Sequence, residues 1–356
     1  MTDELLMVTN QSKIFTVSQQ NIAVLDFGVS TLKVVIVDPV QPEEPLRFQR
    51  IYLPLKTKKE EVEGVLKTLL RSYADYNIRK FIITTTGSFF SSAKESVEFV
   101  INSIIKFINP VNVILYSHDC KFENIKEALE SPTKIVSAGW KALGLGLWEL
   151  IKKDGLIVDF STRSTSFIPI RNGDILSKSS SDFERIKKNE LLFLGMLETN
   201  AAFIQTNFEY NGETYHLPFE SHAITADVFL ITNDLQPADY LTDTPDKKAK
   251  FKEDALGRIK TMFCLDQDRL KEQDLVNIAQ LLKTRLLEII NQTIKKKLEE
   301  NNLDRVILTG IGAPILYHYL NNRNENYEII HVPDIIKTTE INTAFCLAYI
   351  YSLKRG

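Results

Sequence analysis

Two stretches of the chain repeat one pattern of apolar and polar positions. Residues 21–39 read NIAVLDFGVSTLKVVIVDP, and residues 155–175 read GLIVDFSTRSTSFIPIRNGDI. In both, an apolar run ends at an aspartate, a turn rich in small and hydroxyl residues follows, and a second apolar run returns. This pattern predicts strand, tight turn and strand, and such a turn offers backbone N–H groups and hydroxyls to phosphate oxygens. The repeat therefore predicts two similar domains that face each other across a phosphate-binding cleft.

Strand-like and helix-like periods alternate over most of the remaining chain. We expect strands at 46–52, 80–87, 111–117, 304–312 and 326–334, and helices at 58–76, 91–108, 136–153, 246–263, 273–300 and 339–354. The helix at 136–153 is apolar and contains glycine, and we interpret it as the hinge between the two halves. Residues 206–221 resemble a local β excursion inside a less regular region.

A third candidate ligand site lies at the end of the segment VILTGIG, where Gly310 and Gly312 end an apolar strand. Glycine at such an edge lets a ligand approach the backbone closely. After two phosphate hairpins, the order matches the phosphate, phosphate and adenosine sites of the actin-like ATPase fold, which sugar kinases and Hsp70 share. We therefore expect an α/β protein of this ribonuclease H-like class. The expected parts are a polar tail at 1–20, a first domain at 21–154, and a second at 155–356 with an inserted segment at about 180–300.

Candidate phosphate ligands gather in the two turns and at the end of the strand at 80–87. Lys33 can meet anionic oxygens, and Arg163 suits bidentate contact with phosphate. Ordinary hairpin turns, and a cap on the helix at 91–108, are the alternatives. The expected phosphate-binding residues are Gly28, Ser30, Thr31, Lys33, Thr86, Gly87, Ser161, Thr162, Arg163, Ser164 and Thr165.

Three acids are candidate functional groups on the sequence pattern alone. Asp26 and Asp159 stand where the two first strands end, and either can hold a divalent metal or a water. Asp227 lies within an apolar helical pattern, and a buried acid needs a partner or a metal. The segment from Ser181 to Arg185 holds two acids and a cation, with a surface loop as the alternative.

Composition restricts the class of partner. The net charge is −3, the isoelectric point is near 6.1, and 44% of residues are hydrophobic, which favours a soluble globular protein over a nucleic-acid-binding one. Cys120, Cys264 and Cys346 are widely spaced, and the five histidines are equally scattered, so we expect neither disulfides nor zinc. The polar, acidic start does not resemble a signal peptide, and no apolar run approaches membrane-spanning length. We expect a cytoplasmic protein without a membrane or nucleic-acid partner.

Collinear blocks resemble the hydantoinase A/oxoprolinase-like family of archaeal and methylotroph one-carbon metabolism, in its tetrahydromethanopterin-linked branch. The resemblance covers residue 21 to the C-terminus. The blocks are TTTG (84–87), KESVEFVINSI, SAGWKALG, DFSTRSTSFIPIRNGDI, SDFERIKKNELLFLGMLET, ITADVFLITNDL and ALGRIKTMFCLD (255–266).

The resemblance implies an actin-like fold and a transferase of methanofuran biosynthesis. This enzyme would join a γ-glutamyltyramine-like phenol to a furanylmethyl diphosphate and release diphosphate. It implies a small phosphorylated substrate and Mg²⁺, with diphosphate on the loops at 26–33 and 159–165. It also assigns catalytic roles to Asp26, Asp159, Glu184 and Asp227, and places Glu190 near metal or substrate.

The chain departs from the family pattern in its loops. Val29 and Ser161 replace glycines of that pattern, and Arg163 replaces a threonine. Ser88 and Ser166 replace acidic residues. Where the family pattern has Arg-Thr-Pro, this chain has Glu198-Thr199-Asn200. Three interpretations stay open: the transferase, an ATP-using hydrolase or kinase, and a non-catalytic paralogue that binds a metabolite or a partner. Assembly as a homodimer is a further expectation.

Overall fold

The computed structural model describes residues 20–354 with gaps at 88–89, 211, 219–220, 265–269, 324 and 337–341. The expected polar tail, apart from Gln20, and the departure at Ser88 lie outside the described residues. Within the described residues, every helix is too short or too polar to cross a bilayer.

The first half forms a six-stranded sheet in the order β3-β2-β1-β4-β5-β6. β3, β2 and β1 pair with one another antiparallel, β4 and β5 run parallel to β1, and β6 is antiparallel to β5. The strands are β1 (Asn21–Phe27), β2 (Thr31–Val37), β3 (Arg47–Tyr52), β4 (Ile78–Thr85), β5 (Val113–Tyr116) and β6 (Phe122–Asn124).

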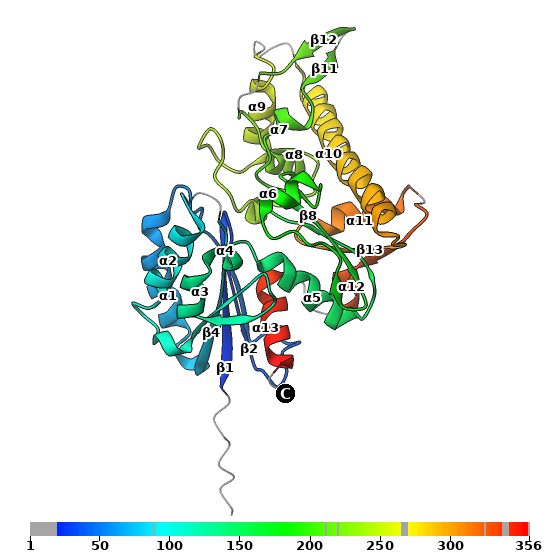
Figure 1. The fold of residues 1–356 in the computed structure, drawn as a ribbon. Helices are drawn as coiled ribbons and strands as arrows, with labels where there is room; N and C mark the ends of the chain where they lie inside the picture. Colours follow the sequence, from blue (N-terminus) through cyan, green and yellow to red (C-terminus); the bar gives the residue numbers. More distant parts are fainter. Residues whose placement is uncertain are drawn as a thin grey trace, which may run out of the picture.

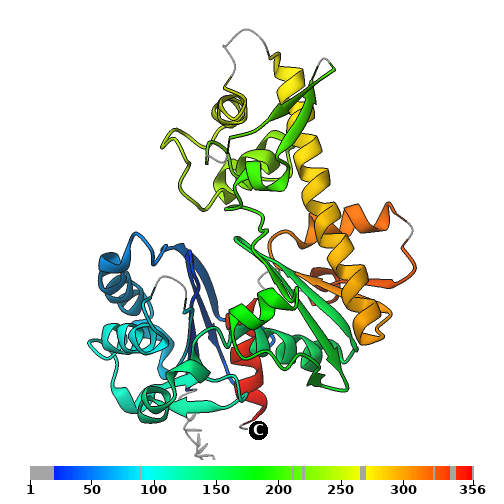
Figure 2. The same cartoon turned by 45° about the horizontal axis from the view of Figure 1, so that its top comes forward.

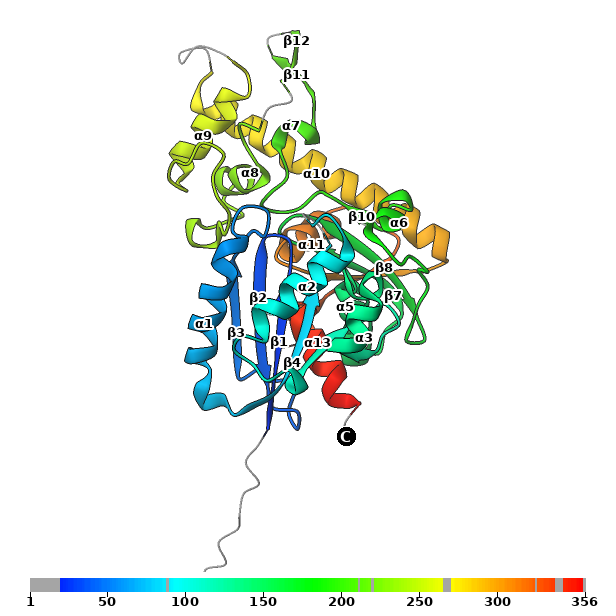
Figure 3. The same ribbon diagram turned by 60° about the vertical axis from the view of Figure 1, so that its left-hand side comes forward.

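Both faces of this sheet are covered, which explains why β1 is a continuous apolar run rather than an alternating one. Ala23 and Leu25 pack toward α1 (Val62–Ser72) and α2 (Ala93–Ile104). Ile22 and Val24 belong to a different core on the opposite face. Figure 3 shows α1 and α2 on one side of the sheet and α13 (Thr343–Leu353) on the other.

The second half repeats this topology. Its sheet has the order β10-β8-β7-β13-β14, again three antiparallel strands followed by two parallel ones. The strands are β7 (Gly155–Phe160), β8 (Thr165–Arg171), β9 (Asp174–Ile175), which pairs with β8, β10 (Leu191–Leu192), β13 (Arg305–Thr309) and β14 (Glu328–His331). The repeated order confirms the expected α/β class and the actin-like fold.

Two apolar helices lie between the sheets. α5 (Gly139–Ile151) and α13 share one core with Ile22 of the first sheet and Ile157 of the second. Figure 1 shows the red α13 beside α5, with β1 and β2 on its other side. Since α13 comes from the second range but packs on the first sheet, it ties the halves together. The domain division at residue 154 stays a prediction.

The inserted segment lies between β10 and β13 and builds a separate lobe, from which the long α10 runs down to the second sheet (Figure 2). The helical patterns at 246–263 and 273–300 correctly predict α9 and α10, and the β excursion is the β11–β12 hairpin. The elements of this lobe are α7 (Ala201–Ile204), β11 (Asn207–Tyr210), β12 (Glu213–His216), α8 (Thr225–Ile231), α9 (Lys252–Thr261) and α10 (Glu272–Asn301).

Short helices complete the fold. The α-helices are α3 (Ile125–Glu130), α4 (Pro132–Ile135), α6 (Asp182–Lys187), α11 (Ala313–Asn321) and α12 (Val332–Ile335), and the 3₁₀ helices are η1 (Lys59–Glu61), η2 (Ala74–Tyr76), η3 (Pro110–Asn112) and η4 (Pro237–Asp239). Among these, α6 lies at the cleft and contributes side chains to the site described next.

Candidate functional site

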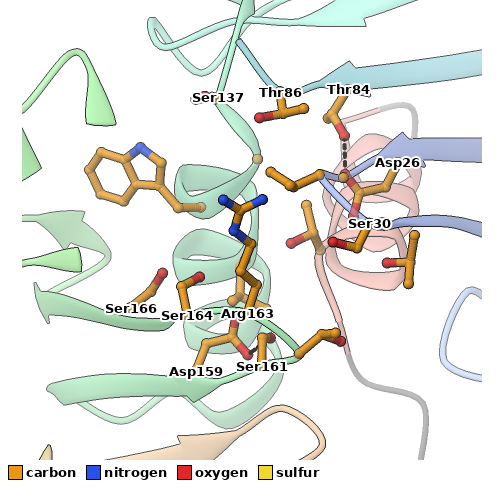
Figure 4. A pocket seen from close by; sticks show the side chains of 18 of the residues that line it. Asp26, Ser30, Thr84, Thr86, Ser137, Asp159, Ser161, Arg163, Ser164 and Ser166 are labelled. Carbon is orange, nitrogen blue, oxygen red and sulfur yellow. Dashed lines mark hydrogen bonds between the residues drawn. The ribbon is translucent and has the colours of Figure 1, made fainter. Parts of the chain in front are cut away.

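The two repeated turns meet in one pocket between the halves, with a volume of about 200 Å³. Figure 4 shows Asp26, Ser30 and Thr84 from the first half opposite Asp159, Ser161 and Ser164 from the second. The sequence-predicted residues that line it are Asp26, Gly28, Ser30, Thr31, Lys33, Thr86, Asp159, Ser161, Thr162, Arg163 and Ser164. The convergence of residues more than a hundred positions apart makes this pocket the candidate site; their roles in binding or catalysis stay predictions.

Two expected phosphate ligands do not line the pocket. Thr165 is fully buried, and its hydroxyl donates to the carbonyl oxygen of Leu194 at 2.6 Å. The backbone N–H of Gly87 donates to the Ser137 hydroxyl at 3.4 Å. Both residues therefore shape the neighbourhood of the pocket rather than its lining.

The register of the first hairpin fixes Asp26. Asp26 pairs with Lys33 across β1 and β2, and the Lys33 Nζ lies 3.1 Å from its Oδ2. From the next strand, the Thr84 hydroxyl donates to Oδ1 at 2.6 Å. The turn is tight at Gly28, whose N–H donates to the Thr31 carbonyl at 3.0 Å and where a Cβ would lie 3.0 Å from that oxygen. Asp26 is therefore held as an oriented carboxylate at the floor of the pocket.

Asp159 occupies the equivalent position in the second half. The Ser161 hydroxyl donates to its Oδ1 at 2.6 Å. Burial raises the pKa of Asp159, while the Ser161 hydrogen bond and the positive charges of Lys33 and Arg185 oppose that rise. The charge of Asp26 adds to it, because the two carboxylates face each other across the pocket.

The two glycines after β13 have a packing role that the sequence did not reveal. Gly310 has φ +89°, and a Cβ there would lie 2.5 Å from Oδ1 of Asp159. A Cβ on Gly312 would lie 2.2 Å from the Phe160 ring. The space beside Gly310 has a volume of only about 60 Å³, and Gly312 does not line it. Nucleotide binding at this edge stays a prediction.

Arg185 is the cation of the Ser181–Arg185 segment, and the sequence did not indicate that it belongs to the pocket between the halves. It lines the pocket from α6 although only 3% of its surface is exposed. Its guanidinium carbon lies 4.6 Å from the centre of the Trp140 ring, and its Nη2 donates to the Glu190 carbonyl at 3.2 Å. Burial lowers the pKa of Arg185 to about 10. Its Nε has no hydrogen-bond partner among the described residues, which leaves a buried donor for an anion.

The acids around α6 have different positions. Asp182 lines the pocket and accepts a hydrogen bond of 2.8 Å from the hydroxyl of Ser137, a residue with φ +58°. Glu184 does not line it; its carboxylate accepts from the N–H and the hydroxyl of Ser180 and fixes the start of α6. Glu190 accepts hydrogen bonds from two buried serine hydroxyls and also lies outside the pocket. Asp182, rather than Glu184, is thus the acid that this segment presents to the pocket.

Asp227 forms a buried ion pair away from the pocket. Arg258 lies 2.8 Å from its Oδ1, the Tyr240 hydroxyl donates at 2.9 Å, and the N–H of Ile224 donates to Oδ2 at 3.0 Å. The partner that a buried acid requires is therefore an arginine of α9. The buried ion pair of Asp227 and Arg258 therefore stabilises the inserted lobe.

A metal ion in this pocket would be coordinated by only a few protein side chains. Among the described residues, no group of three or more His, Cys, Asp or Glu side chains is arranged to bind a metal. Mg²⁺ usually binds through one or two carboxylates together with waters and substrate phosphates. The facing pair of Asp26 and Asp159 fits that kind of site.

Comparison with known proteins adds a family match. The model of the family described as Hydantoinase/oxoprolinase matches residues 84–348. A (4-{4-[2-(gamma-L-glutamylamino)ethyl]phenoxymethyl}furan-2-yl)methanamine synthase from Methanocaldococcus jannaschii is 29% identical over 300 residues, which cover 84% of this chain and 88% of that protein. A synthase of the same name from Methanococcus vannielii is 31% identical over 186 residues, 52% of this chain and 83% of that protein.

Solved structures of similar shape are more distant in sequence. The activator of the 2-hydroxyisocaproyl-CoA dehydratase from Clostridium difficile, with bound ADPNP, has a TM-score of 0.46 at 14% identity and covers 94% of this chain and 97% of its own. A ROK family glucokinase from Streptomyces griseus, in complex with glucose and AMPPNP, has a TM-score of 0.45 at 10% identity and covers 93% and 98%.

Proposed function

Because the chain belongs to the hydantoinase/oxoprolinase family, we propose that it is a synthase that forms an aryl ether in the biosynthesis of methanofuran or a related one-carbon cofactor. The acceptor is a phenol similar to γ-glutamyltyramine, and the donor is a furanylmethyl diphosphate that releases diphosphate. The name shared by the two synthase relatives supports the aryl ether product, since it describes a phenoxymethyl-furan that carries a glutamylaminoethyl group.

The convergence of both repeated turns on one pocket is the observation that carries the proposal. A departing diphosphate gathers negative charge, and preorganised cations and hydroxyls facing that charge stabilise the transition state. Lys33 comes from the first half, and Arg163 and Arg185 come from the second. Hydroxyls from both turns, among them Ser30 and Ser161, line the same pocket. The pocket therefore offers positive charge to a diphosphate from two sides.

The reaction exchanges one carbon–oxygen bond for another. The phenol loses its proton, its oxygen bonds to the furanylmethyl carbon, and the diphosphate leaves with the electron pair of the bond that breaks. Asp26 and Asp159 would hold Mg²⁺ together with diphosphate oxygens and water, and the ion would supply further charge neutralisation. Thr84 and Lys33 keep the Asp26 carboxylate oriented toward the pocket.

Incubation of the full chain with the phenol, the furanylmethyl diphosphate and Mg²⁺ tests the proposal. We expect diphosphate and the aryl ether to appear in equal amounts, measured by a phosphate-release assay and by mass spectrometry. Asp159→Ala should lower turnover by about 100-fold or more, as loss of other preorganised electrostatic groups does. The matched Asp174→Ala changes an exposed acid of β9 and should leave turnover unchanged. Diphosphate release no faster than that of Asp159→Ala would refute the proposal, and diphosphate binding without turnover would favour a non-catalytic paralogue.

A further inference from the structure

A second pocket opens beside the first, on the other side of the first turn. Its volume is about 390 Å³, and Val29, Ser30 and Arg163 line both pockets. Its other walls come from the end of β3 and from the inserted lobe. Two ligands, one in each pocket, would therefore meet at the residues that the pockets share.

Glu198 stands at this boundary with one carboxylate oxygen unused. The Ser30 hydroxyl donates to its Oε2 at 2.6 Å and so links the two halves across the cleft. Its Oε1 is buried and has no hydrogen-bond partner within the described part of the chain. The hydroxyl of Thr242 lies 3.5 Å from the Tyr52 oxygen and is close enough to Glu198 to oppose the rise of its pKa. A buried acceptor left unpaired is costly, so this oxygen is suited to a donor on a ligand.

We propose that the second pocket binds the phenol acceptor and that Glu198 accepts the phenol proton at Oε1 as the ether bond forms. This inference rests on the function proposed above. The phenol O–H bond breaks and its proton passes to Glu198, the phenol oxygen bonds to the furanylmethyl carbon, and diphosphate leaves with the electron pair of its bond to that carbon. Glu198 then returns the proton to water.

The lining of the second pocket fits an aromatic ring with a hydroxyl at one end. Pro54, Ile224 and Pro245 supply apolar surface, and Tyr52 supplies an aromatic one. Small-molecule sites combine such walls with a few placed polar groups that fix orientation.

The ionisation of Glu198 also suits proton transfer. Burial raises the pKa of the Glu198 carboxyl, while the Ser30 hydrogen bond and the Arg163 charge oppose the rise. A raised pKa of the Glu198 carboxyl lies closer to the pKa of the phenol, which is about 10. The carboxylate is therefore a better general base.

Glu198→Gln tests the assignment, because it keeps the shape and the contact with Ser30 but cannot accept a proton. We expect kcat for ether formation to fall by about 100-fold or more, the usual contribution of a general base, with KM for the diphosphate donor unchanged. Glu299→Gln makes the same change at an exposed position of α10 and should behave as the native chain. A Glu198→Gln variant with native kcat would overturn the inference while the proposed function stood.

Two further measurements separate proton transfer from a structural role. In a series of ring-fluorinated phenols, the defect of Glu198→Gln should shrink as the phenol becomes more acidic, because a weaker base then suffices. An equal defect for every phenol would show that Glu198 only supports the pocket. Calorimetry without the diphosphate donor should show weaker phenol binding to Glu198→Gln, and equal binding of the phenyl analogue to both proteins. If the phenol binds both proteins equally, Oε1 does not contact it. If the native chain forms no ether at all, the proposed function itself fails.

Discussion

The crossing of α5 and α13 predicts that Gly146 cannot be replaced even by alanine without loss of stability. A Cβ at Gly146 would lie 2.4 Å from the Cβ and 2.8 Å from the Cα of Cys346. Carbon atoms in contact normally lie about 3.5–4.0 Å apart, so the helices would have to separate by about 1 Å. No rotamer change relieves this contact, because both Cys346 atoms are fixed by the backbone.

The expected loss follows from two opposing effects. Overpacking of a core costs about 1–3 kcal/mol, and the upper end applies here because backbone atoms are involved. Alanine in a helix gains about 0.5–1 kcal/mol over glycine. The net expectation for Gly146→Ala is therefore a decrease of about 2 kcal/mol in the free energy of unfolding.

Urea unfolding followed by far-ultraviolet circular dichroism measures this loss. Gly257→Ala is the matched control, because a Cβ at that position of α9 meets no atom within 4 Å, and it should stabilise the chain by about 0.5–1 kcal/mol. Adding Cys346→Ala to Gly146→Ala should not restore stability, since the clashing Cβ and Cα remain. Native stability of Gly146→Ala, with Gly257→Ala behaving as expected, would refute the reasoning.

Three other predictions concern buried ionisable side chains. Arg258→Met leaves Asp227 buried without its ion-pair partner and should lower the free energy of unfolding in urea by about 3–5 kcal/mol. The control Arg285→Met breaks an exposed ion pair and should cost about 1 kcal/mol or less. Similar losses for the two variants would contradict the assignment of a buried pair. Burial lowers the pKa of His118 below its unfolded value of about 6.5, so the folded state holds fewer protons and stability falls as pH drops below about 6.5. His118→Gln should flatten that fall, and the exposed His216→Gln should not. Arg185→Met should weaken binding of inorganic diphosphate about 10- to 100-fold by calorimetry, the range for a hydrogen bond to a charged group, and unchanged affinity would remove Arg185 from the anion site.

The fold was predictable because its strands are signalled locally. The runs that became β1 and β7 are apolar up to the aspartate near their end, and each is followed by turn residues and a returning strand. Their repetition predicted the doubled topology, and the collinear blocks predicted the family, which the match over residues 84–348 confirms. These signals lie within segments of about twenty residues, so no tertiary contact was needed to find them.

The membership of the site was less predictable because it depends on burial by distant segments. The sequence of α6 shows a serine cap and a short helix, but nothing in it says that Arg185 lies over Trp140, which comes from α5. The same limit applies to Asp227, whose need for a partner was evident but whose partner, Arg258, lies on α9. Gly310 was expected to admit a ligand, whereas the close neighbour that requires it is the side chain of Asp159.

The place of α13 also sets the order in which the chain can fold during synthesis. The residues of β1 and β2 leave the ribosome before all other described strands, yet the helix that covers their inner face begins only at Thr343. Until then, Ile22, Val24 and Val35 expose apolar surface that a finished protein hides. Such surface invites aggregation or chaperone binding. A chain interrupted before Thr343 is therefore expected to aggregate rather than to leave a folded first half.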